Sequence, residues 1–277
     1  MRRFFYLTLL IAATNIAFAQ SKAFDVKVSG KGQPVIFLPG FTCPGEVWDQ
    51  TITNMDGKFK THQFTYAGFG GVSEIALPWY GTLVAEISAY IESNKLKNVV
   101  LIGHSMGGML AIDLAAKHPD RIAKMIMVDA LPCIREIMMP QFTAEQITFD
   151  NPYNNQMMAA SDSALRVTAG YMAMGMSNST EKHEQLINYI LQSDRETYVY
   201  GYTELLKLDL RDKLASIPAQ TLILGADYPS KEAVIPNFEK QFNALKNKEI
   251  KIANNSKHFI MFDQAEWFYQ EVNNFLN

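Results

Sequence analysis

The sequence predicts a doubly wound, mostly parallel α/β sheet, and three observations support this. Short apolar runs alternate along the chain with segments of helical periodicity. The run Val99–Ile102 is continuously apolar, as expected for a strand that is buried on both faces of a parallel sheet. Leu83, Ile87 and Ile91 repeat at a spacing of four, which marks one face of a helix. Alternation of this kind predicts parallel strands joined by right-handed crossovers.

The strand candidates define the size of the sheet. Six apolar runs qualify, at residues 33–38, 61–66, 98–102, 122–128, 221–224 and 249–252. Only one or two short strands, near residues 25–28, can precede Pro34. We therefore expect a sheet of seven strands or fewer.

Further helices are predicted after the third and the last of these runs. Met109, Ile112 and Ala116 share a helix face, and Pro119 ends that helix. Near the end of the chain, Asp263 stands three residues before Glu266. This spacing is typical of a capping box, which predicts that Asp263 opens the last helix.

Length and composition limit the classes of protein. The chain has 277 residues, of which 48% are hydrophobic and 19% charged, with a net charge of -3. These values fit one large domain, or one domain with an inserted lid, and argue against a disordered chain. The mild negative charge gives no reason to expect nucleic acid or an anionic membrane as a partner.

The first 19 residues have the layout of a secretory signal peptide. Arg2 and Arg3 supply the positive start, an apolar stretch begins at Phe4, and Ala17-Phe18-Ala19 is a small-x-small cleavage site. The apolar stretch is shorter than the roughly 20 residues that a bilayer span needs. We expect cleavage near Ala19, a secreted or periplasmic protein, and no stable membrane insertion after cleavage.

The strand–helix alternation breaks between Leu131 and Ser216, where helical patterns occur without a convincing strand. We predict a helical lid at residues 131–216, inserted into a core formed by residues 20–130 and 217–277. The insertion is rich in methionine: Met138, Met139, Met157, Met158, Met172, Met174 and Met176. Methionine is an adaptable apolar filler, so these side chains either line a pocket or pack the lid on the core.

Ser105 is the candidate nucleophile. It lies in Gly103-His104-Ser105-Met106-Gly107, directly after the apolar run Val99–Ile102 and before a predicted helix. A sharp strand-to-helix turn needs glycine on both sides of the serine and exposes the serine hydroxyl above the sheet. The positive N-terminus of the following helix favours a developing oxyanion.

A serine hydroxyl needs a base, and His258 is the preferred candidate. It follows the last predicted strand, and such loops lie at the carboxyl edge of a doubly wound sheet, where ligands bind. The other histidines lie in less suitable places: His62, His104, His118 and His183.

A carboxylate should orient the imidazole of the base. Asp227 and Asp129 both follow predicted strands, so either side chain can reach the carboxyl edge. Asp227 is preferred because it lies on the penultimate strand, in the chain order Ser, Asp, His. Asp129 is the alternative acid.

Two backbone N–H groups should form an oxyanion hole. Met106 directly follows the nucleophile and supplies the first N–H group. Phe41 follows Pro39-Gly40 after an earlier strand and is expected to supply the second, with its ring walling the pocket.

Taken together, these motifs resemble the α/β-hydrolase superfamily over nearly all of the chain that follows the signal peptide. The resemblance rests on Pro39-Gly40-Phe41, Gly68-Phe69-Gly70, Gly103–Gly108, His118–Arg121, Asp209-Leu210-Arg211 and His258-Phe259 before Asp263. It implies a hydrolase of esters or amides with a helical cap, and neither a cofactor nor a metal. Serine at position 105 argues against the branches of the superfamily that use aspartate there.

The resemblance also places Cys43 after the oxyanion loop and Cys133 at the start of the lid. A disulfide between them would pin the root of the lid to the core. The alternative is two separate free cysteines.

We therefore expect a serine hydrolase that cleaves a carboxylic ester of an apolar, small-molecule acyl substrate through an acyl-enzyme. An aminopeptidase, a lactonase or a thioesterase would use the same triad. A hydrolase-like receptor that binds a ligand and turns it over slowly is the alternative from another class.

Overall fold

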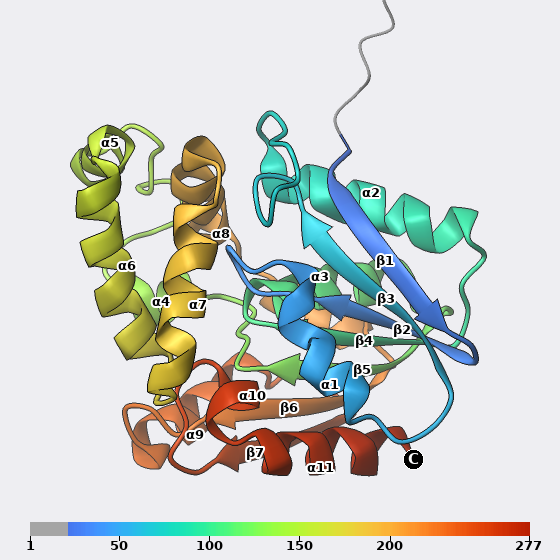
Figure 1. Ribbon diagram of the computed structural model, residues 1–277. Helices are drawn as coiled ribbons and strands as arrows, with labels where there is room; N and C mark the ends of the chain where they lie inside the picture. The colour runs from blue at the N-terminus through green and yellow to red at the C-terminus, as the bar shows by residue number, and fades with distance from the viewer. Residues whose placement is uncertain (1–21) are drawn as a thin grey trace, which may run out of the picture.

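The computed structural model describes residues 22–277, so the predicted signal peptide at residues 1–19 lies outside the described residues. A seven-stranded sheet forms the centre, with strand order β1-β3-β2-β4-β5-β6-β7 (Figure 1). Strand β1 is antiparallel to β3, and every other neighbouring pair is parallel. The fold class and the number of strands agree with the sequence prediction.

The strands begin and end within two residues of the predicted runs. Their bounds are β1 Phe24–Gly30, β2 Gln33–Leu38, β3 Phe59–Tyr66, β4 Val99–His104, β5 Ile122–Val128, β6 Gln220–Ala226 and β7 Lys248–Ala253. All six residues of β4 are buried, as its unbroken apolar run predicts for a central parallel strand.

Alternate residues of each central strand face two separate cores. In β2, Ile36 and Leu38 join one buried cluster, whereas Val35 and Phe37 join the other. The helices α2 (Trp79–Ser93), α3 (Met106–Lys117) and α9 (Lys231–Gln241) contribute to the first cluster. The short α1 (Asp49–Thr53), with the 3-10 turn η1 (Gly45–Trp48), and the C-terminal α11 (Ala265–Leu276) contribute to the second, with α10 (Ile260–Asp263) before it. Helices therefore cover both faces of the sheet.

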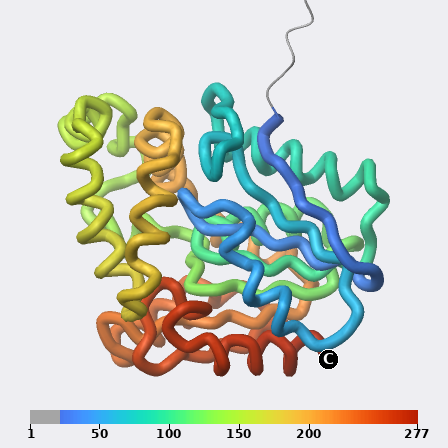
Figure 2. Tube along the Cα trace, in the orientation of Figure 1, coloured from blue at the N-terminus to red at the C-terminus, as the bar shows by residue number. Residues whose placement is uncertain are grey.

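A helical insertion, residues 131–216, connects β5 to β6 and lies beyond the carboxyl ends of the parallel strands (Figures 1 and 2). Its elements are α4 Arg135–Met138, α5 Pro152–Ala159, α6 Asp162–Met176, α7 Thr180–Leu191, the π-helical turn η2 Thr197–Gly201, α8 Tyr202–Lys207 and the 3-10 turn η3 Arg211–Ser216. Helices α6 and α7 pack side by side (Figure 2).

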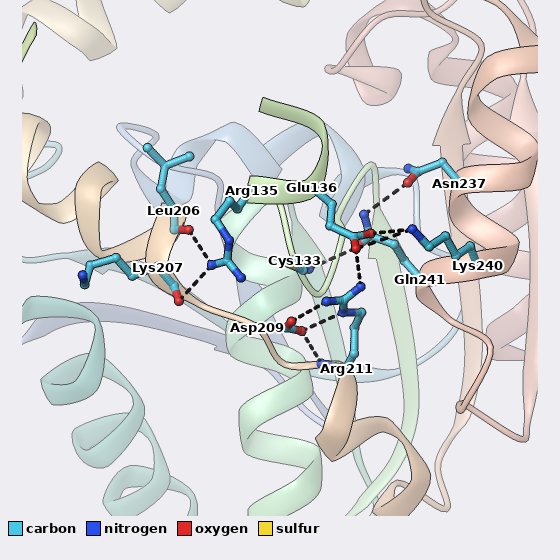
Figure 3. A network of polar contacts seen from close by, with 10 residues as sticks. All are labelled: Cys133, Arg135, Glu136, Leu206, Lys207, Asp209, Arg211, Asn237, Lys240 and Gln241. Carbon is cyan, nitrogen blue, oxygen red and sulfur yellow. Dashed lines mark hydrogen bonds and ion pairs between the residues drawn. The ribbon is translucent and has the colours of Figure 1, made fainter. Parts of the chain in front are cut away.

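Polar contacts join the two ends of the insertion (Figure 3). Arg135 donates hydrogen bonds to the carbonyls of Leu206 (3.1 Å) and Lys207 (3.2 Å). Arg211 pairs with Glu136 at 2.7 Å, and its hydrogen bond lowers the pKa of the Glu136 carboxyl. These contacts therefore join the first segment of the insertion to its last segment at the edge of the sheet.

The methionines of the insertion have mixed surroundings. Met157 is buried, and the Sδ atom of Met172 accepts a hydrogen bond from the Tyr198 hydroxyl at 3.3 Å. Met138 and Met174 are instead exposed. Packing is thus the role of some of these side chains, whereas Met138 and Met174 are accessible to solvent. Within residues 22–277, no helix has the length and the apolar character that a membrane span requires.

The predicted capping box at Asp263 is wrong. The N-cap position of α11 is Gln264, and no side chain there caps the helix. The Asp263 carboxylate instead accepts hydrogen bonds from residues 177–179 and from Lys257. Hydrogen bonds from distant residues therefore occupy the Asp263 carboxylate oxygens that would otherwise cap the helix.

The first turn of α3 has no room for a side chain at Gly107. A Cβ atom at Gly107 would lie 2.0 Å from the carbonyl oxygen of Leu38 in β2. Helix α3 therefore packs directly on the backbone of the neighbouring strand.

We expect Gly107→Ala to lower the free energy of unfolding by about 1–3 kcal/mol, because overpacking must displace backbone atoms. Gly170→Ala in α6 is the matched control, since a Cβ atom there meets nothing within 4 Å. It should raise the stability by up to about 1 kcal/mol, from helix propensity alone. Urea unfolding followed by tryptophan fluorescence measures both variants, and equal stability of the two would contradict this packing argument.

Candidate active site

The candidate site lies where the order of the strands reverses. The chain passes from β2 outward to β3 and then returns to β4 on the other side of β2. The loops that follow β2 and β4 consequently leave the sheet edge toward opposite faces of the sheet, which is the arrangement at which open α/β sheets bind ligands. Phe41 follows β2 and Ser105 follows β4, so the topology brings the two predicted residues to this point of the sheet edge.

Ser105 occupies a strained backbone conformation, with φ 54° and ψ -121°. Its N–H group donates to the Val128 carbonyl (2.9 Å), which ties the turn to β5. A Cβ atom at Gly103 would lie 2.4 Å from the Gly107 carbonyl oxygen, so glycine is required for the chain to fold back this closely. The sharp turn leaves the Ser105 side chain partly exposed at the start of α3.

The loop after β2 lies directly against this turn. A Cβ atom at Gly40 would lie 3.4 Å from the Ser105 Cβ atom and 2.6 Å from Nδ1 of His104. The Cys43 N–H group donates to the Gly40 carbonyl (3.1 Å), which closes a turn around Phe41. Phe41 directly follows Gly40, so its backbone lies close to the turn at Ser105.

The ring of Phe41 is surrounded by aromatic side chains. Ring centroids of Phe69, Trp79, Tyr202 and Tyr198 lie 4.9, 5.8, 5.5 and 6.1 Å from it. Two of these residues belong to the core and two to the helical insertion. The aromatic cluster thus fixes the loop after β2 and joins it to the insertion.

His258 lies in the loop between β7 and α10. Its ring packs on the ring of His104, with centroids 4.5 Å apart, and its carbonyl accepts a hydrogen bond from His104 Nε2 (3.0 Å). His104 directly precedes Ser105, so these contacts hold the His258 loop next to the turn. Burial lowers the pKa of His104 well below its ordinary value, which keeps this neighbouring imidazole neutral.

Asp129, the alternative acid, contacts His258. Its Oδ2 atom lies 2.7 Å from His258 Nδ1, and its Oδ1 atom accepts the Ala226 N–H group at 2.9 Å. A carboxylate can only accept, so Nδ1 carries a proton, and in the neutral form of the ring the lone pair is then on Nε2. Asp129 has φ 43° at the end of β5, and its N–H group donates to Leu224 (2.7 Å), so β6 fixes its position.

The preferred acid, Asp227, makes a different set of contacts, and the predicted pairing of Asp227 with His258 is wrong. Its oxygens accept the N–H groups of Asn255 (2.9 Å) and Ser256 (3.0 Å). The loop after β7 crosses the end of β6, where Asp227 supports its backbone, and reaches the end of β5 with His258. Asp129 is therefore the carboxylate within reach of the ring.

The two predicted oxyanion donors, Met106 and Phe41, lie on the segments that follow β4 and β2. Met106 is the first residue of α3, and the first N–H groups of a helix have no acceptor within it. Phe41 lies in the turn that contacts Ser105. The two backbone segments flank the serine from neighbouring strands β4 and β2.

Cys43 and Cys133 are both free and buried, so the disulfide considered from the sequence is absent between them. Cys43 belongs to the buried cluster that includes Phe37 and Trp48. The Cys133 N–H group instead donates to Gln241 Oε1 (3.1 Å) of α9 (Figure 3). The two residues follow different strands and pack in different surroundings, which the spacing in the sequence does not disclose.

Sequence reasoning missed three contributors to this region. His104 was set aside as a candidate base, yet it contacts the His258 carbonyl. Tyr198 and Tyr202, from a segment predicted only as lid, contact the Phe41 ring. No local pattern marks either role, because each depends on contacts between distant segments.

Across residues 22–277, no three His, Cys, Asp or Glu side chains gather into a group suited to a metal ion.

The fold and the site define a doubly wound α/β protein with a serine on a strand-to-helix turn and a histidine–carboxylate pair beside it. The model of the alpha/beta hydrolase family matches residues 35–271. The chain belongs to this family.

Similar proteins cover most of the chain. The pimeloyl-[acyl-carrier protein] methyl ester esterase of Vibrio cholerae serotype O1 is 24% identical over 251 residues, covering 89% of this chain and 95% of that protein. An esterase from Exiguobacterium antarcticum has a similar structure, with a TM-score of 0.76, 20% identity, and coverage of 91% and 94%. The enol-lactonase from Burkholderia xenovorans LB400 gives a TM-score of 0.75 at 15% identity, with coverage of 91% and 96%.

The free cysteines give a chemical test of this region. Burial raises the pKa of Cys43 to about 12 and also raises the pKa of Cys133. We expect both thiols to react slowly with a thiol reagent in the native protein at pH 8, because the thiolate is the reactive form.

Denaturation without a reductant should release two reactive thiols per chain, the full cysteine content of the sequence. A reduced and denatured sample provides the reference count. A count of zero before reduction would show that the two residues are bridged.

Proposed function

We propose that this protein is a serine esterase that hydrolyses a carboxylic ester through an acyl-enzyme, with Ser105, His258 and Asp129 as its triad. The contact between His258 Nδ1 and Asp129 Oδ2 at 2.7 Å, beside the strained turn of Ser105, is the observation that carries the proposal. It supports a ring held by Asp129 at Nδ1, which in its neutral form presents Nε2 as the proton acceptor.

In the proposed reaction, Ser105 Oγ attacks the carbonyl carbon of the ester while His258 Nε2 takes its proton. The N–H groups of Phe41 and Met106 hold the resulting oxyanion, and Asp129 stabilises the imidazolium. The tetrahedral intermediate collapses as the alcohol leaves with the proton from His258. Water then attacks the acyl-enzyme with His258 again as the base, which releases the acid and restores Ser105.

The surroundings of the site support an apolar acyl or alkyl group. Aromatic rings of Phe41, Tyr198 and Tyr202 converge on the loop beside Ser105, and they come from both the core and the insertion. We propose that the helical insertion serves as the lid of this site. The relatives named as esterases support an ester as the bond that is cleaved.

The sequence also supports export as part of the proposal. Arg2 and Arg3, the apolar stretch that follows and Ala17-Phe18-Ala19 have the order of a signal peptide. We propose that the esterase acts outside the cytoplasm, after cleavage near Ala19.

Ser105→Ala should lower the turnover of an apolar aryl ester by at least about 10³-fold, because the hydroxyl that forms the acyl-enzyme is lost. A panel of chromogenic acyl esters, thioesters, lactones and aminoacyl amides, applied to the wild type and the variant, measures the loss and defines the bond preferred. A fluorophosphonate probe should label the wild type only. Unchanged turnover in the variant would refute the proposed mechanism, whereas labelling of the wild type without turnover would indicate a ligand-binding receptor.

The two candidate acids give a matched comparison. Asp129→Asn should lower kcat by about 10³- to 10⁴-fold, because an amide in place of the carboxylate no longer fixes the productive tautomer of His258. Asp227→Asn should have a much smaller effect on kcat, since Asp227 contacts only backbone N–H groups of the loop. Steady-state kinetics on an aryl ester separates the two, and a larger loss for Asp227→Asn would assign the acid to Asp227.

A further inference from the structure

The Asp263 carboxylate joins two distant segments. Its Oδ1 atom accepts hydrogen bonds from the Ser177 hydroxyl (2.6 Å) and from the N–H groups of Asn178 (2.9 Å) and Ser179 (3.2 Å). Its Oδ2 atom accepts the N–H group of Lys257 at 2.8 Å. Residues 177–179 form the turn between α6 and α7 of the insertion, and Lys257 directly precedes His258. One side chain therefore binds both the far turn of the insertion and the loop of the histidine.

Three further contacts join the same two segments. The Phe259 N–H group donates to the Met176 carbonyl (3.0 Å), and Lys257 Nζ donates to the Met174 carbonyl (2.6 Å). The amide of Asn178 donates to the Asn255 carbonyl at 3.0 Å. The last turn of α6 thus holds the backbone immediately after His258 and the side chain of the residue before it, and the turn after α6 holds the backbone at Asn255.

Removal of the Asp263 carboxylate destabilises this group of contacts. Ser177 is fully buried, and removal of the carboxylate takes away the acceptor of its hydroxyl. Hydrogen bonds to an ionised acceptor are also stronger than those between neutral groups. Asp263 therefore contributes more to the position of this loop than a single neutral contact would.

We propose that Asp263 is a positioning residue that couples the α6–α7 turn of the insertion to the backbone of His258. The inference rests on the proposed function, in which His258 is the base. Asp129 orients the ring of His258, and His104 holds its carbonyl. Asp263 sets the N-terminal side of the same residue through Lys257, so a shift of the insertion displaces the base.

Catalytic geometry is sensitive to displacements of this kind, since a misplacement of about 1 Å can cost about 10²-fold in rate. Asp263→Asn keeps the size of the side chain, but its NH₂ group cannot accept one of the two sets of hydrogen bonds. We expect kcat for an aryl ester to fall by about 10- to 100-fold with KM changed less than about twofold. The rate of labelling by a fluorophosphonate should fall in parallel, because both reactions need the base.

Glu266→Gln is the matched control, because it removes an exposed carboxylate three residues away in the first turn of α11. It should retain the kinetics of the wild type. Thermal unfolding of each variant identifies the fraction that is folded, so that a loss of rate is not a loss of native protein.

Ser177→Ala tests the coupling from the side of the insertion and removes a single hydroxyl, so it keeps the test open if Asp263→Asn fails to fold. It should lower kcat less than Asp263→Asn, and the double variant should lose less than the product of the two single effects. Independent effects of the two substitutions, or a kcat for Asp263→Asn equal to that of Glu266→Gln, would overturn the inference.

The parent proposal can fail separately. If Ser105→Ala kept the turnover of the wild type, the esterase mechanism itself would be wrong. If Ser105→Ala were inactive and Asp263→Asn fully active, only the positioning role would be lost.

Discussion

The close approach of the β4–α3 turn to the end of β2 is the constraint on which the site depends. Gly107 lies so near the Leu38 carbonyl that a Cβ atom would be 2.0 Å away. This contact sets α3 against the sheet, directly after the strained backbone of Ser105. It also places the Phe41 loop beside the serine, because β2 and β4 are neighbours at the point where strand order reverses.

Three aspartates at the carboxyl edge of the sheet make different contacts with His258 and with the loop that precedes it. Asp129 contacts the ring of His258, and Asp227 binds the backbone at Asn255 and Ser256. Asp263 binds the next N–H group, at Lys257. Asp129 and Asp227 directly follow β5 and β6, and Asp263 ends α10 after β7, so three successive segments each add one support to the same loop. A carboxylate that binds backbone N–H groups and one that orients an imidazole are thus indistinguishable by residue type alone.

The sequence was sufficient for the parts of the structure that local periodicity controls. Seven strands, the helices on both faces and the turn at Ser105 follow from apolar spacing and glycine placement. The pairing of His258 with Asp129 does not, because two aspartates end neighbouring strands and only the path of the last loop separates them. Asp263 has the spacing of a helix cap, and donors from the insertion, 84 to 86 residues away along the chain, override that local preference.

The histidine loop lies far along the chain from the serine, and this separation has a consequence for the order in which the protein is made. Ribosomal synthesis releases Ser105 and Asp129 well before His258, the base proposed here. Helix α11, which covers one core through Phe268 and Val272, is released later than His258. In the proposed mechanism, a nascent chain therefore carries its serine before its base, and hydrolysis cannot begin before the loop after β7 has been made.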